Sequence, residues 1–144
     1  MSQNPVGNHI FDVAVIGAGP AGLATACALA HNGLTTALLA APHRPAGNRP
    51  DTRTAALFND SIQLLKHLGA WEHMHGHCAR MEGIRLVDDT DGLLKAPEVL
   101  FSASEIGEDT FGYNVPQPVL TDGLRRAADA FGSTLTVIET DGVD

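Results

Sequence analysis

Short apolar runs alternate with a longer stretch rich in alanine and leucine at the start of the chain. The run Phe11–Ile16 (FDVAVI) is rich in β-branched residues, which is typical of a strand buried on both faces of a parallel sheet. In the stretch 20–32, Pro20 suits a first helical turn and Gly33 suits a left-handed cap, so we expect a helix. A second apolar run, Thr35–Ala40, completes a strand-helix-strand unit with a right-handed crossover.

The middle of the chain has a different pattern. Ala41–Arg53 holds three prolines and a glycine, which predicts an irregular loop across the surface. Thr54–Leu68 places leucines and an isoleucine at largely helical spacing before a glycine, so we expect a helix there. Met81–Val87 and Leu93–Phe101 flank an aspartate-rich turn and predict an antiparallel hairpin added to the main sheet.

The last part of the chain returns to the first pattern. Tyr113–Val115 is a short apolar segment, 118–131 predicts a helix, and Leu135–Glu139 predicts a further strand. No linker, repeat or low-complexity tract divides the chain. We therefore expect one α/β, three-layer, Rossmann-like domain over residues 1–144, with a parallel core sheet, an added β-hairpin and a flexible tail at 1–9.

Composition and charge narrow the classes of function. Of the 144 residues, 44% are hydrophobic, which is enough for one compact core. The net charge of −8 argues against nucleic acid as a partner and against an anionic membrane surface. The two cysteines suggest no disulfide framework, and the polar start has no signal-peptide order, so we expect a cytoplasmic protein.

A glycine fingerprint follows the first expected strand. The segment 17–22 reads GAGPAG, which is a GxGxxG motif between a strand and a helix. Gly17 would make the tight turn, Gly19 would let the backbone approach a pyrophosphate, and Gly22 would let helix and strand pack closely. Backbone N–H groups at the helix start would then bind the phosphates. The predicted cofactor-binding residues here are Gly17, Ala18, Gly19, Pro20, Ala21 and Gly22.

The fingerprint lacks one residue that usually accompanies it. A carboxylate commonly ends the second strand about 20 residues beyond the glycines and binds the adenosine ribose. Spacing places Ala40 at that position, followed by Ala41 and Pro42, and none of these side chains can accept a hydrogen bond. We expect backbone, water or a neighbouring group to hold the ribose instead.

Further motifs carry a resemblance to a known family over nearly the whole chain. They are Asp51-Thr52-Arg53-Thr54, then Leu68-Gly69 with Trp71, and the segment Phe111–Val115 leading to Leu120. With the glycine fingerprint, these motifs resemble the ubiquinone-biosynthesis hydroxylases, a branch of the class A flavoprotein monooxygenases related to 4-hydroxybenzoate hydroxylase.

The resemblance implies the FAD-binding domain of an aromatic-ring hydroxylase, truncated before the rest of the enzyme. FAD would be the cofactor, NAD(P)H a transient reductant, and O2 the source of the hydroxyl group for a phenolic or polyprenyl-phenol substrate. Arg53 matches the arginine that lies along the flavin, and Gln117 stands near a second cofactor contact, although Pro118 replaces an arginine of many relatives. Membrane contact, where it occurs, would involve missing parts, and we expect this piece alone to hold FAD poorly and to hydroxylate nothing.

Several alternatives stay open from the sequence. The same FAD cradle occurs in reductases, cyclases and halogenases, and a non-catalytic nucleotide-binding or partner-binding module would also fit. Arg53 could simply pair with Asp51 or Asp60. We expect no metal at His73, His75, His77 and Cys78, because alternating residues share a face only in a strand, and a solvated helix end is the expected alternative.

Overall fold

The computed structural model describes residues 9–42, 51–92 and 95–141. The α-helices are α1 (Pro20–His31), α2 (Asn59–His67) and α3 (Gln117–Asp129). The strands are β1 (Val13–Ile16), β2 (Thr36–Ala40), β3 (Thr54–Phe58), β4 (Ala79–Met81), β5 (Gly83–Leu86), β6 (Val99–Ser102), β7 (Gly112–Pro116) and β8 (Leu135–Glu139). The flexible tail expected at 1–9 lies outside the described residues except for His9.

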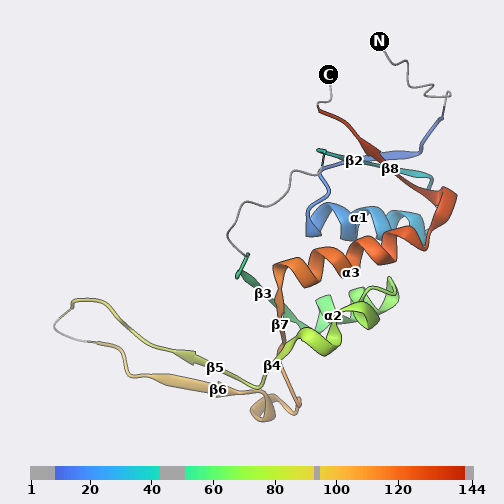
Figure 1. Cartoon of the computed structure of the whole chain (residues 1–144). Coiled ribbons are helices and arrows are strands. Elements are labelled where there is room, and N and C mark those ends of the chain that lie inside the picture. Colours follow the sequence, from blue (N-terminus) through green and yellow to red (C-terminus); the bar gives the residue numbers. More distant parts are fainter. Residues whose placement is uncertain (1–8, 43–50, 93–94, 142–144) are drawn as a thin grey trace.

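The core sheet is parallel, as the sequence predicts. Its strand order is β1-β2-β8, so strands from the first and the last part of the chain belong to one sheet, on either side of β2 (Figure 1). Opposite Leu38 of β2 stand Val15 of β1 and Val137 of β8, and Ala40 stands opposite Glu139. The central strand β2 is the most buried of the three, which fits its uninterrupted apolar sequence.

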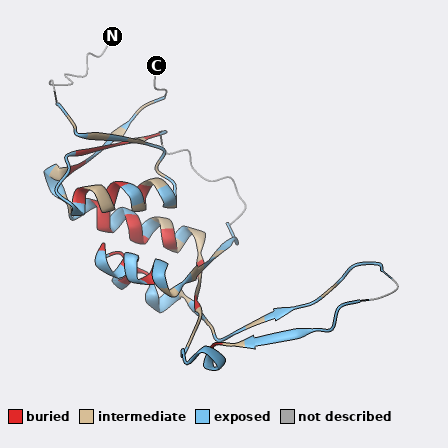
Figure 2. Ribbon diagram, turned by 180° about the vertical axis from the view of Figure 1, so that it is seen from behind, coloured by how far each residue is buried: buried red, intermediate tan, exposed pale blue. Residues whose placement is uncertain are grey.

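Helices cover one face of this sheet. Helix α1 contacts all three strands, and α3 packs against α1 on the side away from the sheet (Figure 1). Their shared interface is buried (Figure 2) and is built from small residues and leucines, including Leu23, Cys27 and Leu124. The expected third layer is not seen within the described residues, and Ile16 of β1 is 70% exposed.

The helix expected over Thr54–Leu68 is wrong in its first third. Thr54–Phe58 forms β3, which pairs antiparallel with β7, and α2 begins only at Asn59. Alanine and leucine favour a helix locally, but pairing with a distant strand overrides that preference. Strands β3, β7 and β4 form a second, antiparallel sheet.

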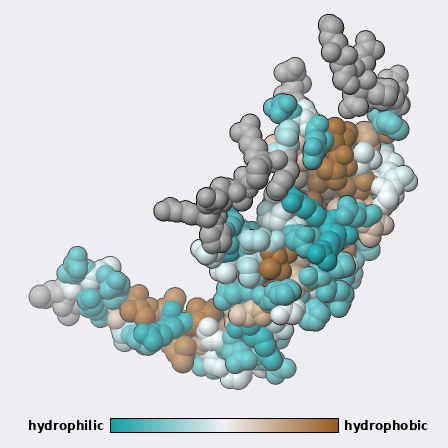
Figure 3. Space-filling view, viewed as in Figure 1, coloured by the Kyte–Doolittle hydropathy of each residue, from teal (hydrophilic) through white to brown (hydrophobic). Residues whose placement is uncertain are grey.

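The expected hairpin exists but does not join the main sheet. Strands β5 and β6 form a separate two-stranded sheet that extends away from the rest (Figure 1), and the start of the expected segment 93–101 falls partly outside the described residues. Its exposed apolar side chains are visible in Figure 3. The carboxylate of Asp88 accepts hydrogen bonds from Thr90 and from the backbone of Ala96, as in a turn.

The histidine-rich segment is not the end of one helix. It forms two short 3₁₀ turns, Trp71–His73 and His75–His77. Among the described residues, no group of three or more histidine, cysteine or acidic side chains lies close enough to hold a metal. No helix in residues 9–42, 51–92 or 95–141 has the length and apolar character needed to cross a bilayer.

Candidate functional site

The glycine turn between β1 and α1 requires glycine at two positions. Gly17 has a φ of +103°, in the region that favours glycine, and its N–H donates to the carbonyl of Leu39 on β2 at 2.9 Å. A Cβ at Gly22 would stand 1.8 Å from the carbonyl oxygen of Gly17. Gly17 and Gly22 therefore set the shape of the turn and the close approach of helix to strand.

The amino end of α1 is open to a ligand. Gly19 is the N-cap residue, no side chain caps the helix, and the backbone hydrogen bonds of the helix start with Leu23 N–H to Gly19 C=O. The N–H groups of Ala21 and Gly22 are thus left without a helical partner. Apart from its own chain neighbours, no atom of the described residues lies within 4 Å of the position that a Cβ on Gly19 would take. The turn fits a phosphate group, because unpaired backbone donors stand at a helix start where an added Cβ on Gly19 would meet open space.

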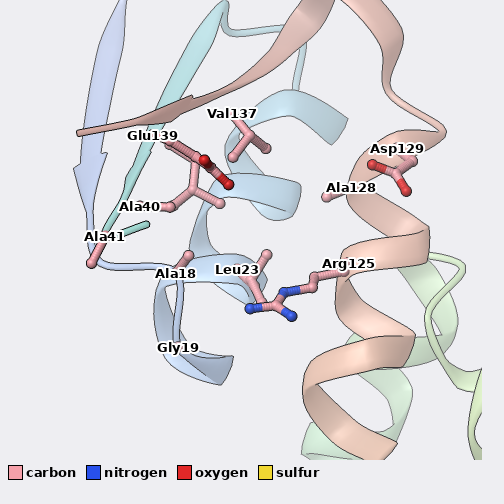
Figure 4. Close-up of a pocket in the computed structure, with 11 residues that line it drawn as sticks. Ala18, Gly19, Leu23, Ala40, Ala41, Arg125, Ala128, Asp129, Val137 and Glu139 are labelled. Carbon is pink, nitrogen blue, oxygen red and sulfur yellow. The ribbon is translucent and has the colours of Figure 1, made fainter. Parts of the chain in front are cut away.

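A cavity of about 570 Å³ adjoins this helix end. Its walls come from the glycine turn, from β2 and β8 at the carboxyl edge of the sheet, and from α3 (Figure 4). This is where open α/β sheets bind ligands. The lining residues are Ala18, Gly19, Leu23, Leu38, Ala40, Ala41, Arg125, Ala128, Asp129, Val137 and Glu139.

Ala40 lies in this cavity wall, as its position at the end of β2 predicts. It is 8% exposed and stands opposite Glu139 in the β2–β8 register. The N–H of Thr140 donates to the carbonyl of Ala40 at 2.9 Å, which ties the two strand ends together. The end of β2 thus offers no carboxylate, but the neighbouring strand places one in the same cavity.

A second cavity, of about 430 Å³, brings three predicted site residues together. Pro20, Arg53 and Gln117 all line it, although they come from different parts of the chain. The N–H of Gln117 donates to the carbonyl of Arg53 at 2.9 Å, so the start of α3 is joined to the segment before β3. The other lining residues are Asp51, Pro118, Thr121, Asp122 and Arg125.

Arg53 is held by Asp51 in a two-point ion pair. Its Nε and Nη2 donate to the two carboxylate oxygens at 2.9 and 2.8 Å, and its backbone N–H donates to one of them at 3.1 Å. These hydrogen bonds lower the pKa of Asp51 to about 2. Of the two pairings considered from sequence, the one with Asp51 is present. Arg53 and Asp51 both line the second cavity, so their ion pair fixes the direction of the guanidinium at the cavity wall. The contact of Arg53 with the cofactor remains a prediction.

Arg125 is a site residue that the sequence reading missed. It lines both cavities, which makes them neighbours along one face of α3. Gln117, Thr121 and Arg125 follow each other at a spacing of four, so they share this face. This spacing of four along the predicted helix could have identified Arg125 as a neighbour of Gln117 from the sequence.

The side chains of two further motif residues, Ala21 and Trp71, do not line these two cavities. Ala21 lies in the wall of a separate apolar cavity with Leu57 and Leu120. Trp71, from the LGxW motif, is 7% exposed and packs edge-on against Tyr113, with ring centroids 4.9 Å apart. The DxRT motif is therefore at the candidate site, whereas LGxW belongs to the core.

The cysteines are not placed for chemistry. Cys27 is fully buried in α1, and burial raises the pKa of its thiol to about 11. Cys78 is half-buried, its thiol donates to the carbonyl of Met74, and burial raises its pKa as well. Neither thiol is prepared to act as a nucleophile.

The sequence agrees with a known family over most of its length. Residues 11–141 match the model of the family described as FAD binding domain. This chain belongs to that family. The glycine turn, the open end of α1 and the two cavities are thus features of an FAD-binding domain.

Two curated proteins are similar to this FAD-binding domain. The 3-demethoxyubiquinol 3-hydroxylase of Escherichia coli is 30% identical over 126 residues, which is 85% of this chain and 31% of the relative. The uncharacterized protein slr1300 of Synechocystis is 30% identical over 120 residues, which is 83% of this chain and 28% of the relative. The chain spans less than a third of the length of either relative.

Solved structures support the fold of the FAD-binding domain. The flavin-dependent monooxygenase PieE, crystallised with FAD and substrate, matches with a TM-score of 0.65 at 20% identity, over 90% of this chain and 24% of that one. The myxobacterial chondrochloren halogenase CndH, described as a variant of FAD-dependent halogenases, matches with a TM-score of 0.63 at 22% identity, over 90% and 28%. The expected α/β architecture with a parallel sheet is confirmed.

Proposed function

We propose that this chain is the FAD-binding part of an NAD(P)H- and O2-dependent aromatic-ring hydroxylase of ubiquinone biosynthesis, acting on a phenolic or polyprenyl-phenol substrate. The observation that carries the proposal is the position of the DxRT segment. Its arginine lines the second cavity beside Gln117 and next to the glycine turn. The 30% identity to the Escherichia coli hydroxylase over 85% of the chain supports the same class of reaction.

The two cavities suggest how FAD would be oriented. The open N–H groups at the start of α1 would bind the pyrophosphate, and the first cavity, at the edge of β2 and β8, would take the adenosine half. Arg53 and Gln117, in the second cavity, would then lie toward the flavin half. When bound, FAD supplies the electron transfer and oxygen chemistry, and the protein supplies position and electrostatics.

Local positive charge is needed for this arrangement. The chain has a net charge of −8, whereas the cofactor carries a negatively charged pyrophosphate. The amino end of α1 and the side chain of Arg125 place positive potential at the junction of the cavities. Arg53 also lines the second cavity, but its ion pair with Asp51 offsets its charge, so it offers a directed hydrogen-bond donor and not added positive potential.

The test is a purification of the full-length protein followed by spectroscopy and product analysis. We expect bound FAD, loss of the oxidised flavin absorbance on addition of NAD(P)H, and faster loss when a polyprenyl phenol is present. Incubation under isotopically labelled O2 should then give a phenol with one additional labelled oxygen atom. Flavin reduction with an unlabelled, chlorinated or saturated product would contradict the hydroxylase and favour a halogenase or a reductase. A protein without flavin would favour a non-catalytic module.

A further inference from the structure

The first cavity contains a carboxylate that the FAD fingerprint does not account for. Glu139 is the last residue of β8 and stands opposite Ala40, at the carboxyl edge of the parallel sheet. Figure 4 shows its carboxylate on the cavity side, next to the side chain of Ala40. No described residue forms a hydrogen bond or an ion pair with this carboxylate. Within the described residues, its acceptor oxygens thus face the cavity without a protein partner.

The place of Glu139 relates it to the missing ribose carboxylate. In dinucleotide-binding folds, an acidic residue after the second strand of the fold accepts hydrogen bonds from the adenosine ribose. Here that strand is β2, which ends in Ala40, and β8 is its hydrogen-bonded neighbour. A glutamate on the adjacent strand at the same level can present its two oxygens to the same space, because paired residues on parallel strands project to the same face.

We propose that Glu139 binds the adenosine ribose of FAD, so that β8 supplies the carboxylate that β2 lacks. The inference rests on the proposed binding of FAD in the first cavity. The adenosine would then be bound by a side chain of β8 and not, as is usual in this fold, by a side chain at the end of β2.

The charges around Glu139 favour this assignment. Arg125 and Asp129 lie four residues apart on α3, a spacing that permits an ion pair, yet they form none. In Figure 4 the guanidinium of Arg125 extends from α3 toward Leu23 and the glycine turn, whereas Asp129 lies further along α3, beyond Ala128. Arg125 thus places positive charge in the cavity from the α3 side, facing Leu23 and the glycine turn. This charge reduces the repulsion between the carboxylate of Glu139 and the pyrophosphate.

Asp129 is the other carboxylate of the cavity and serves as the matched control. It lies on α3 beside Ala128, away from the end of β2 (Figure 4). If Glu139 acts by binding the ribose, only its replacement should weaken binding. If any negative charge in this cavity has the same effect, the two replacements should be equivalent.

The experiment is a flavin-fluorescence titration of the full-length apoprotein with FAD and with FAD that lacks the 2′-hydroxyl of the adenosine ribose. Glu139→Gln should weaken FAD binding by about tenfold or more, because a hydrogen bond to a charged acceptor is replaced by one to a neutral acceptor. The wild type should lose affinity for the deoxy analogue, and Glu139→Gln should lose much less on the same change of ligand. Asp129→Asn should bind FAD within about twofold of the wild type, since it removes no ribose contact.

A second variant tests whether a carboxylate at the end of β2 can replace the one on β8. Ala40→Glu in the Glu139→Gln background restores a carboxylate at the end of β2 and should recover most of the FAD affinity. Circular dichroism reports whether this variant folds, since Ala40 is buried. If it does not fold, the comparison of the two ligands on Glu139→Gln decides the question alone.

The outcomes distinguish this inference from the proposed function. If Glu139→Gln binds FAD as tightly as the wild type, or if the deoxy analogue loses equal affinity in both proteins, Glu139 does not hold the ribose. The FAD-binding function then stands and only this inference is overturned. If the wild-type protein does not bind FAD at all, both are overturned.

Discussion

Replacing Gly22 by alanine should destabilise the fold, whereas replacing Gly19 should weaken cofactor binding and leave the fold intact. The two glycines lie three positions apart in one turn, but their surroundings differ. A Cβ at Gly22 would stand 1.8 Å from the carbonyl oxygen and 3.0 Å from the carbonyl carbon of Gly17, both backbone atoms. At Gly19, beyond its chain neighbours, no atom in the part of the chain that the structure describes lies within 4 Å of the added carbon.

The expected size of each effect follows from these contacts. In Gly22→Ala, α1 must move away from β1 by about an ångström or more to relieve the overlap with Gly17. Such overpacking costs about 1–3 kcal/mol, and loss of the Gly17 N–H bond to Leu39 adds about 1 kcal/mol. The better helix propensity of alanine returns about 1 kcal/mol, so the net loss should be about 1–3 kcal/mol. For a domain of this size the melting temperature should fall by roughly 3–10 °C.

Gly19→Ala should behave in the opposite way. Its φ of −76° and ψ of 175° are accessible to any residue, and alanine lowers the entropy of the unfolded chain by about as much as it loses as an N-cap. The melting temperature of the apoprotein should therefore change by no more than about 3 °C. The new methyl group would stand where the backbone is open to the phosphates, so FAD affinity should fall by about tenfold or more.

Thermal denaturation of the apoproteins and flavin-fluorescence titration measure both quantities on the same samples. An unchanged melting temperature for Gly22→Ala would refute the close contact between helix and strand. An unchanged dissociation constant for Gly19→Ala would refute the approach of the pyrophosphate to this turn.

Three further predictions follow from the site and the core. Arg53→Ala should weaken FAD binding in the same titration but leave the melting temperature nearly unchanged, because Arg53 is 78% exposed and solvent screens exposed ion pairs. Unchanged FAD binding with a lowered melting temperature would make the pair with Asp51 purely structural. Cys27 should resist iodoacetamide at about pH 8 in a Cys78→Ser variant. Its alkylation, followed by mass spectrometry, should require opening of the fold because Cys27 is 0% exposed, and stability should fall as the pH rises from 9.0 toward about 11, because burial raises the pKa of the thiol and the folded state retains the proton longer. Leu124→Ala should cost about 2–5 kcal/mol in urea unfolding, since Leu124 is 1% exposed.

Local patterns predicted the parts of the site that depend on neighbours in sequence. The run before Gly17, the proline at the start of α1 and Gly33 after it gave the turn and the helix directly, because strand, turn and helix each have their own local signal. The DxRT motif was informative for a different reason. It marked Arg53 through a family resemblance, and the structure then placed Arg53 on a cavity wall beside Gln117.

The missed features depend on residues that are far apart in sequence. Thr54–Phe58 has the composition of a helix, and its strand partner β7 begins only at Gly112. Glu139 ends a strand that was expected, yet nothing local places it opposite Ala40, because the order of strands in a sheet is set by tertiary packing. Arg125 differs from both, since its spacing from Gln117 and Thr121 could have revealed it.

The pairing of β2 with β8 has a consequence for how the domain folds. Residues 41–134, with the antiparallel sheet, the hairpin and α3, lie between these neighbouring strands. Closing so long a connection has an entropic cost, and proteins with such distant pairings fold slowly. We therefore expect the edge formed by Ala40 and Glu139 to form late in folding, after β8 has left the ribosome. A ligand that touches both strand ends would bind the completed sheet and not its precursors, so FAD should slow the unfolding of this edge more than that of the β3–β7 pair, as amide hydrogen exchange would show.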